Sequence, residues 1–326
     1  MPPRIVSLLP SATESLCAID GESLLVGRSH ECDYPLGISE IPALTAPAIK
    51  PERATNPGAI DAEVRRQMSS GQSLYSVNEK LLADLKPDLI LTQDLCEVCS
   101  IDLKTVRRIA ETLSPRPEIV SLNPQTFEGV LDDLYTIGRA AGLESQAVSK
   151  AADLRERMFA AAEFVNALED GPNVVLLEWT DPLFVGGHWT PQLIERAGAR
   201  HPLNPTVAKE EAGAAAGPQM AERLAGKSIR VDPEIVGALN PDAIIIAPCG
   251  MDLATTRTCA DALLKQEWFQ GLKAVREGRV AIVDGNQMFN RPGPRLVDAF
   301  EFLVGWLNNR AGVIPIGFPW TLLERP

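Results

Sequence analysis

The chain has 326 residues, of which 45 % are hydrophobic and 23 % charged, and its formal net charge is −12. Domains usually contain ~100–200 residues, so this length favours two globular domains. A protein that binds the phosphate backbone needs clustered Lys and Arg, so the acidic balance argues against a nucleic-acid partner. The apolar runs fall short of the ~20 residues that a membrane-spanning helix needs, so we expect no membrane span.

The first residues bear on the cellular compartment. Met1 to Arg4 lead directly into the apolar run Ile5–Leu9. A signal peptide would need a longer apolar stretch and a small-residue cleavage site. We therefore expect a cytoplasmic protein, or a periplasmic or extracellular one if the sequence is a trimmed mature form.

Strand-like and helix-like segments alternate in the first half of the chain. The run Ile5–Leu9 predicts a strand, and Ser11-Ala12-Thr13-Glu14 has the pattern of a capping box that begins a helix ending near Ile19. Further strands are predicted at Leu24–Gly27, Asp88–Thr92 and Glu118–Leu122. This alternation is typical of a parallel sheet with helices on both faces.

Two helices are predicted in the middle of the chain. Apolar residues at helical spacing begin at Phe127 and are interrupted by Gly142. A second helix is predicted from Glu144 to Leu168. At 1.5 Å per residue it would extend roughly 37 Å, which is long enough to connect two small lobes.

The strand and helix alternation restarts in the second half, with strands predicted at Val174–Glu178, Ala243–Ala247 and Val280–Val283. We therefore predict an α/β fold of two doubly wound parallel-sheet lobes joined by one long helix, with a ligand cleft between the lobes. The expected division is an N-terminal lobe at 1–143, a bridging helix at 144–170, a C-terminal lobe at 171–311 and a surface tail at 312–326.

Segments that follow predicted strands are the expected ligand-binding positions, because ligands of open parallel sheets bind beyond the carboxyl ends of the strands. Polar, aromatic and sulfur-containing residues concentrate there. The candidate ligand contacts are Ser11, Tyr34, Gln93, Asp94, Glu178, Trp179, His188, Trp189, Met288, Phe289 and Arg295.

Several of these residues have a structural alternative. Trp179, Trp189 and Phe289 would form an aromatic wall for a flat apolar ligand, or they would pack in the core. His188 follows Gly187, where the backbone can approach a ligand closely. Glu178 ends a buried strand and needs a partner, which Arg295 would supply. His30 is either a ligand contact or a residue that caps a loop.

The six cysteines raise the question of a metal site. Cys96-x-x-Cys99 has the spacing with which two thiolates converge on one metal or exchange a disulfide, although an inert buried turn is the alternative. Cys32 and either Cys249 or His188 would complete the four ligands of zinc. The candidate metal ligands are therefore Cys32, Cys96, Cys99 and Cys249. Cys17 and Cys259 fall within helix-like runs and are expected to be small buried side chains.

The chain resembles the ABC-transporter substrate-binding proteins with a helical backbone, whose members bind cobalamin, haem and iron–siderophore chelates. The resemblance covers roughly residues 4–310, is closest to the cobalamin-binding branch, and implies two lobes joined by one rigid helix. The motifs that carry it are Arg4–Glu14, Cys32-Asp33-Tyr34-Pro35, Leu85–Leu91 and Pro294-Arg295.

The chain also departs from that family pattern. Members dock on a permease through one acidic residue per lobe. Glu79 lies one residue too far from Lys86-Pro87 for the first of these, and Asn290 occupies the second place. Met288 stands where cobalamin binders have tryptophan. The cysteines resemble a signal-less subgroup with Gln-Asp-Leu-Cys-x-Val-Cys and Glu-Trp-x-Asp-Pro motifs.

Three functions are consistent with these observations. The favoured one is a protein that binds cobalamin or another metal chelate, performs no chemistry of its own and has an ABC permease as its candidate partner. The second is a cytoplasmic metalloprotein or enzyme whose cysteines hold zinc or an iron–sulfur cluster. The third is an enzyme with a cysteine nucleophile, which would need a base beside a reactive thiolate.

Overall fold

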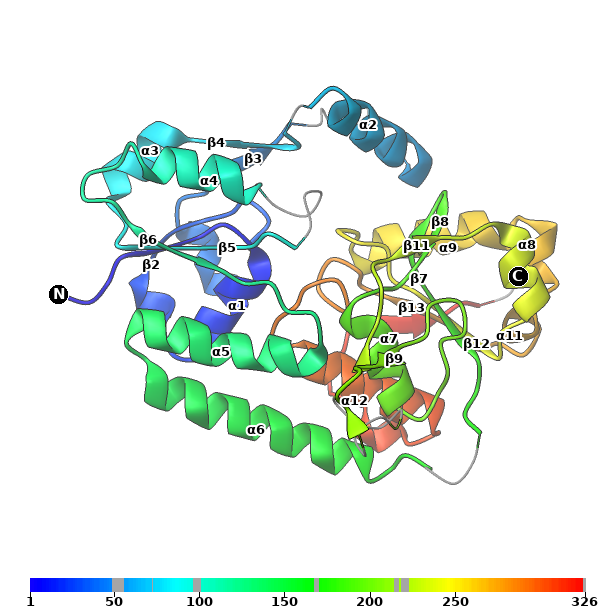
Figure 1. Ribbon diagram of the computed structural model, residues 1–326. Coiled ribbons are helices and arrows are strands. Elements are labelled where there is room, and N and C mark those ends of the chain that lie inside the picture. Colours follow the sequence, from blue (N-terminus) through cyan, green and yellow to red (C-terminus); the bar gives the residue numbers. More distant parts are fainter. Residues whose placement is uncertain are drawn as a thin grey trace. The chain divides into compact units, whose positions relative to one another are not determined.

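The computed structural model (Figure 1) describes residues 1–48, 56–71, 73–95, 101–166, 170–213, 217 and 223–324. The chain divides into two compact units. Unit 1 contains Met1–Thr55, Ala59–Pro124 and Gly129–Leu154, and unit 2 contains Asn56–Gly58, Gln125–Glu128 and Arg155–Pro326. In the described part of the chain, every helix is too short or too polar to cross a membrane.

Unit 1 alternates strands and helices, as the sequence predicted. Its elements, which include the short 3-10 helices η1 and η2, are β1 (Ile5–Ser7), α1 (Pro10–Ala18), η1 (Glu22–Leu24), β2 (Leu25–Arg28), η2 (Leu36–Glu40), β3 (Thr45–Pro47), most of α2 (Pro57–Ser69), β4 (Tyr75–Val77), α3 (Glu79–Leu85), β5 (Leu89–Thr92), α4 (Leu103–Ala110), β6 (Glu118–Ser121) and most of α5 (Phe127–Ala141). Helix α6 (Glu144–Ala162) begins in unit 1 and ends in unit 2.

The main sheet of unit 1 is wholly parallel, with the strand order β2-β1-β5-β6. Figure 1 shows α3 and α4 on one face of this sheet and α1 on the other. On the first face, Val6 and Ile90 pack against Leu82 of α3 and Val106 of α4. Both faces are covered, which explains why the central strands are continuous apolar runs rather than alternating ones.

Helix α1 begins differently from the expected capping box. Leu9 is the N-cap residue, Pro10 takes the first helical position, and the cap makes no side-chain hydrogen bond. Proline is well suited to this position because its fixed φ is helical and its missing N–H would have had no partner in the helix. Ser11 therefore lies inside the first turn, where it is buried.

Unit 2 contains a second α/β arrangement. Its elements, which include the short 3-10 helix η5, are β7 (Val174–Thr180), β8 (Leu183–Val185), α7 (Trp189–Arg196), β9 (Val207–Ala208), β10 (Arg223–Leu224), β11 (Ile229–Arg230), α8 (Pro233–Leu239), β12 (Ala243–Ile246), α9 (Leu253–Leu264), α10 (Glu267–Gln270), α11 (Lys273–Arg276), β13 (Val280–Val283), α12 (Leu296–Leu307), η5 (Ala311–Val313) and β14 (Trp320–Leu322).

The six-stranded sheet of unit 2 has the order β11-β8-β7-β12-β13-β14. The three strands predicted from the sequence, β7, β12 and β13, form its parallel centre. Strands β8, β11 and β14 join antiparallel at the two sides, which the sequence did not predict. One face packs against α8 to α11 through residues such as Val236, Ala260, Phe269 and Val275. The α/β fold class is confirmed.

The C-terminal tail is mostly exposed or half-buried, as expected of a surface segment, but it also contributes a strand to the sheet of unit 2. Strand β14 pairs with β13, and Trp320 lies opposite Val283. The Phe318 ring stacks on Phe302 with 4.6 Å between centroids, and Leu323 is buried. Aromatic burial of this kind stabilises the tail by a few kcal/mol, since a fully buried side chain contributes about 1.5–3 kcal/mol. The tail therefore completes the sheet.

Helix α6 begins at Glu144 as predicted but ends at Ala162 rather than Leu168. With 19 residues it is about 28 Å long. Its last turn tightens, because the Val165 N–H bonds the Ala162 carbonyl three residues back. Val165 then packs beside Gly198, where a Cβ atom would collide with it. This tertiary contact draws the chain off the helical path.

Candidate ligand-binding site

The carboxyl ends of the parallel strands of unit 1 meet at one edge of its sheet, which we name edge 1 and define by the last residues of β1, β2, β5 and β6 and the loops that follow them. Gln93 directly follows β5 and is buried, and the next residue, Asp94, is exposed. The Asp94 backbone N–H donates to Asn123 Oδ1 at 2.6 Å, which ties the loop after β5 to the loop after β6.

A hydroxyl network holds the loop after β2. Thr45 Oγ1 accepts the His30 backbone N–H at 3.0 Å, lies 2.7 Å from His30 Nδ1 and lies 2.9 Å from Ser29 Oγ. Thr45 and Ser29 are buried, whereas the His30 ring is half-buried. Burial lowers the pKa of His30, and the charge of Arg28 lowers it further. The neutral imidazole is therefore favoured.

The rest of this loop is anchored in unit 1. Tyr75 donates its phenol hydrogen to Glu31 Oε1 at 3.2 Å, and its ring lies 5.8 Å from the His30 ring. Cys32, a predicted metal ligand, is 2 % exposed, and its Sγ lies 3.1 Å from Thr13 Oγ1 on α1. Tyr34, a predicted ligand contact, is 42 % exposed.

Edge 1 also contains a polar group that the sequence analysis missed. Thr92, the last residue of β5, is fully buried, and its Oγ1 has no hydrogen-bond partner within the described residues. A buried hydroxyl without a partner costs about 1–3 kcal/mol. The sequence signal was a single polar residue at the end of an apolar strand, beside Gln93.

Unit 2 has a corresponding edge, which we name edge 2 and define by the residues that follow β7, β12 and β13. The Cys249 backbone N–H donates to the Glu178 carbonyl at 3.1 Å, so the ends of β12 and β7 are held together. A side chain at Gly285 would collide with the carbonyl oxygen of Pro248. Edge 2 therefore brings Glu178, Cys249 and the segment after β13 together.

A hydrogen-bond network organises the segment after β13. Asp284 Oδ1 accepts the Gln287 backbone N–H at 2.9 Å, and Gln287 Oε1 accepts a hydrogen bond from Arg295 Nη1 at 2.7 Å. Arg291 donates to Asn286 Oδ1 at 2.9 Å. Burial raises the pKa of Asp284, and hydrogen bonds from the backbone of Gln287 and Asn286 partly oppose this. Arg295 is thus oriented by Gln287.

The predicted aromatic contacts lie in different surroundings. Trp189 is 6 % exposed, and its Nε1–H donates to the Phe289 carbonyl at 2.6 Å. Phe289 and Met288 are buried as well. Trp179 is half-buried, and its indole N–H donates to the Asp181 carbonyl at 2.9 Å. Trp189 and Phe289 are therefore brought together, with Trp189 fixed by a bond to the loop after β13.

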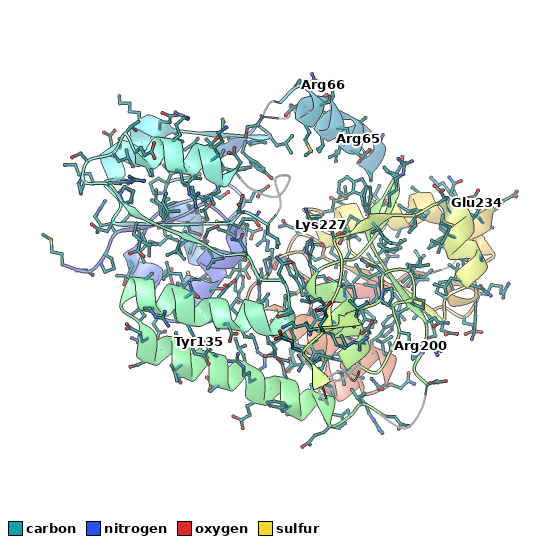
Figure 2. The ribbon with its side chains drawn as sticks, viewed as in Figure 1. Arg65, Arg66, Tyr135, Arg200, Lys227 and Glu234 are labelled. Atoms are coloured by element: carbon teal, nitrogen blue, oxygen red, sulfur yellow. The ribbon has the colours of Figure 1, made fainter. Side chains whose placement is uncertain are left out.

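His188 is placed differently from the sequence expectation. Strand β8 runs antiparallel to β7, so the chain returns along β7 and the Gly186 N–H bonds the Leu176 carbonyl. A side chain at Gly187 would collide with the backbone of Lys227 and Ser228, so the close approach at this glycine is made by the protein itself. Burial lowers the pKa of His188, and so does the charge of Lys227, which is labelled in Figure 2.

The family described as "Periplasmic binding protein" matches residues 5–286, which is most of the chain. The chain belongs to the periplasmic binding protein family. This family consists of binding proteins rather than enzymes, in agreement with the favoured prediction. The resemblance seen in the sequence is confirmed by this match.

Two relatives within the family are similar over nearly the whole chain. The uncharacterized ABC transporter substrate-binding lipoprotein YvrC of Bacillus subtilis is 25 % identical over 93 % of this chain and 79 % of the relative. A cobalamin-binding protein of Halobacterium salinarum is 22 % identical over 94 % of this chain and 70 % of the relative.

Solved structures of periplasmic binding proteins share the fold. A heme-binding protein from Pseudomonas aeruginosa has a TM-score of 0.65 and 20 % identity, covering 95 % of this chain and 94 % of that one. The vitamin B12-binding protein BtuF of Vibrio cholerae has a TM-score of 0.63 and 19 % identity, covering 95 % and 98 % of the two chains. At these identities the likeness is one of fold.

Glu79 and Asn290, the two residues that the sequence analysis compared with docking acids, are both engaged within their own units. Glu79 begins α3 on the surface and forms an ion pair of 2.8 Å with Arg108. Asn290 donates through Nδ2 to the Ala247 carbonyl at 2.9 Å and to the Gly285 carbonyl at 2.7 Å. Asn290 thus links the segments after β12 and β13.

The cysteines are in unlike surroundings. Cys96 and Cys99 lie outside the described residues. Cys249 is exposed and Cys259 is buried, while burial raises the pKa of the half-buried Cys17 to about 12. Among the described residues, the structure brings together no group of three or more His, Cys, Asp or Glu side chains suited to a metal ion.

Proposed function

We propose that this protein binds cobalamin or a closely similar metal chelate, and that residues of edge 1 in unit 1 and of edge 2 in unit 2 are the candidate contacts. The observation that carries the proposal is the family match over residues 5–286 together with the cobalamin-binding relative aligned over 94 % of the chain. Similar solved structures bind heme or vitamin B12, which are flat macrocyclic metal chelates with polar substituents. Edges 1 and 2 offer half-buried aromatic and polar side chains, the usual composition of a small-molecule site.

The candidate contacts stand as part of this proposal, and the structure gives them different weights. Asp94 and Tyr34 are exposed, and Trp179 and Arg295 are half-buried, so part of each side chain is accessible without rearrangement. The others are more buried or lie farther from the strand ends, and they would act mainly by shaping the site. They are Ser11, Gln93, Glu178, His188, Trp189, Met288 and Phe289.

The transport partner and the compartment belong to the same proposal. An ABC permease as partner is supported by the B. subtilis relative, which is named as an ABC transporter substrate-binding lipoprotein. Location in the cytoplasm stays a prediction, whereas the relatives, which are named as a lipoprotein and as periplasmic proteins, favour the outer side of the membrane. Fractionation of the native host, followed by detection of the endogenous protein, distinguishes the two compartments.

Metal binding at Cys32, Cys96, Cys99 and Cys249 is a separate prediction. Replacing Cys96 and Cys99 with Ser should abolish bound metal while leaving the fold intact, because both units are built on apolar strands. Elemental analysis of the two purified proteins is the measurement. Background metal content in both would contradict this prediction and leave chelate binding unaffected.

Titration with cyanocobalamin and with haemin tests the proposed function. All five tryptophans lie in unit 2, so quenching of tryptophan fluorescence reports a ligand that approaches edge 2. We expect a Kd of ~1 µM or tighter for at least one of the two chelates, which corresponds to about −8 kcal/mol. Asp94→Ala should weaken binding, whereas Asp84→Ala, which removes an exposed carboxylate from α3, should not. Absence of binding to both chelates would contradict the proposal.

A further inference from the structure

His30 is a side chain of edge 1 to which the proposed function gives no role. It lies two residues beyond the end of β2, where the ligand of an open parallel sheet is expected. His30 is half-buried, so part of the residue remains accessible. The sequence left its role open between a ligand contact and a loop cap.

One nitrogen of the His30 ring is already occupied. Nδ1 lies 2.7 Å from Thr45 Oγ1, and Thr45 is itself fixed by Ser29 and by the His30 backbone N–H. The Tyr75 ring packs at 5.8 Å and limits rotation of the imidazole. The other ring nitrogen, Nε2, makes no hydrogen bond within the part of the chain that the structure describes.

The hydroxyl network allows Nε2 to carry a lone pair. Thr45 Oγ1 accepts the His30 backbone N–H, so its remaining lone pair can accept Nδ1–H while its own proton goes to Ser29 Oγ. The neutral ring then presents an unprotonated Nε2. Histidines that bind metals are held in this way, with the second ring nitrogen hydrogen-bonded so that tautomer and orientation are fixed.

We propose that His30 Nε2 coordinates the metal of the bound chelate at its exchangeable axial position. This inference rests on the proposed function and adds the bond by which unit 1 would recognise its ligand. In the exchange, the Nε2 lone pair forms a cobalt–nitrogen bond and the axial water leaves as a neutral molecule. Neither cobalt nor protein changes oxidation state, and the proton stays on Nδ1.

The other candidate donors nearby are less suited to this bond. Cys32 has the softer atom, but its Sγ is buried against Thr13 and only 2 % of the residue is exposed. Glu31 accepts the Tyr75 hydroxyl. His30 therefore combines accessibility, a neutral ring and a fixed orientation, which favour it as the axial ligand.

Two corrinoids that differ in one axial ligand test this bond. Aquocobalamin carries an exchangeable water, whereas the cyanide of cyanocobalamin is held tightly. We expect the wild type to bind aquocobalamin at least ~10-fold more tightly and to shift its visible absorption bands, because a nitrogen ligand replaces water. His30→Ala should remove both the preference and the shift.

Two variants that each remove one hydroxyl distinguish loss of the His30 orientation from general damage to the loop. Thr45→Val keeps the shape of the side chain but removes the bond to Nδ1, so it should weaken the aquocobalamin preference by about 10-fold. Ser76→Ala removes an exposed hydroxyl from the paired strand β4 and should change nothing. Unchanged melting temperatures in all three variants would show that the fold survives.

The outcomes distinguish this inference from the proposed function. Equal affinity for both corrinoids with unshifted bands, or a shift that persists in His30→Ala, would overturn axial coordination while leaving chelate binding in place. If haemin alone binds, the same comparison applies to the haem absorption band in wild type and His30→Ala. Failure of all three chelates to bind would overturn both proposals.

Discussion

Unit 1 and unit 2 both place candidate residues at the carboxyl ends of parallel strands, but they hold them differently. Edge 2 is crosslinked by side chains: Asn290 bonds two carbonyls, and Arg295 bonds Gln287. Edge 1 instead contains the buried Thr92 hydroxyl and the Nε2 atom of His30, each without a hydrogen bond among the described residues. Side chains thus crosslink the segments of edge 2, whereas edge 1 combines the bond between Asp94 and Asn123 with two polar atoms that make no hydrogen bond among the described residues.

The difference follows from the two sheets. In unit 2, antiparallel strands on both sides and the docked tail hold the ends of the parallel strands, and Gly285 permits close contact between neighbouring loops. Unit 1 relies on four parallel strands and their helical connections. The aromatic residues make the units separately observable, because all five tryptophans lie in unit 2 and all three tyrosines lie in unit 1.

The largest expected effect is loss of the aromatic cluster of unit 2. Phe302 is fully buried and contacts Phe318 and Trp320 at 4.6 and 5.0 Å between ring centroids. Phe302→Ala should lower the free energy of unfolding of unit 2 by about 3–5 kcal/mol, as for other large-to-small changes in cores. Urea denaturation followed by tryptophan fluorescence measures this loss. Unchanged stability would show that the tail does not help to hold edge 2.

Acidification should weaken unit 2 through His201. Burial lowers the pKa of His201 from 6.5 to about 4, although its hydrogen bond with the Asn204 backbone opposes the shift, and Nε2 of the neutral ring accepts the Leu176 N–H. The neutral ring stabilises the fold fully above pH 6.5, and this contribution is lost as pH falls through about 4. The expected loss is about 3 kcal/mol. Tryptophan-detected denaturation at pH 7 and pH 4 should show it, and His201→Gln should flatten the dependence.

Unit 1 should respond to pH with the opposite sign. Burial raises the pKa of Asp133 on α5 from 3.8 to about 7, and the neighbouring Asp132 adds to the shift. Its protonated form stabilises unit 1 fully below pH 3.8, and this contribution is lost as pH rises through about 7. The shift corresponds to about 4 kcal/mol, which solvent screening of the half-buried carboxyl reduces to about 2 kcal/mol, and Asp133→Asn removes this pH dependence. Amide hydrogen exchange in peptides from α5 measures it; exchange that slows as pH rises, after correction for intrinsic rates, would contradict the assignment.

The smallest expected effect is the difference in stability loss between replacing one side-chain amide at edge 2 and one at edge 1. Asn290→Ala leaves the carbonyls of Ala247 and Gly285 without their donor and should cost about 1–2 kcal/mol. Asn123→Ala in unit 1 removes an exposed acceptor of one backbone N–H and should cost about 0.5 kcal/mol. Thermal melts measure the stability lost in each variant. Equal losses would contradict the stronger crosslinking of edge 2 compared with edge 1.

Short apolar runs predicted the main strands of both units because four or five consecutive buried residues suit a strand that is covered on both faces. The same rule placed Gln93 directly after β5 and Cys249 after β12, whereas Glu178 lies inside β7, which continues to Thr180. It failed for His188, because an antiparallel hairpin returns the chain along β7. It also gave no sign that Ser29, Thr45 and His30 form one network, since Thr45 lies 15 residues from His30 and meets it only through folding.

The sequence by itself determined the α/β class, the parallel strands and the family, because these depend on local apolar patterns and on motifs contiguous in the chain. Tertiary structure decided the end of α6, where Val165 packs beside Gly198, and the role of the tail, where Phe318 stacks on Phe302. It also decided which polar atoms at each edge already have hydrogen bonds. These outcomes depend on contacts between residues that are far apart in the sequence, and a local sequence pattern does not specify such contacts.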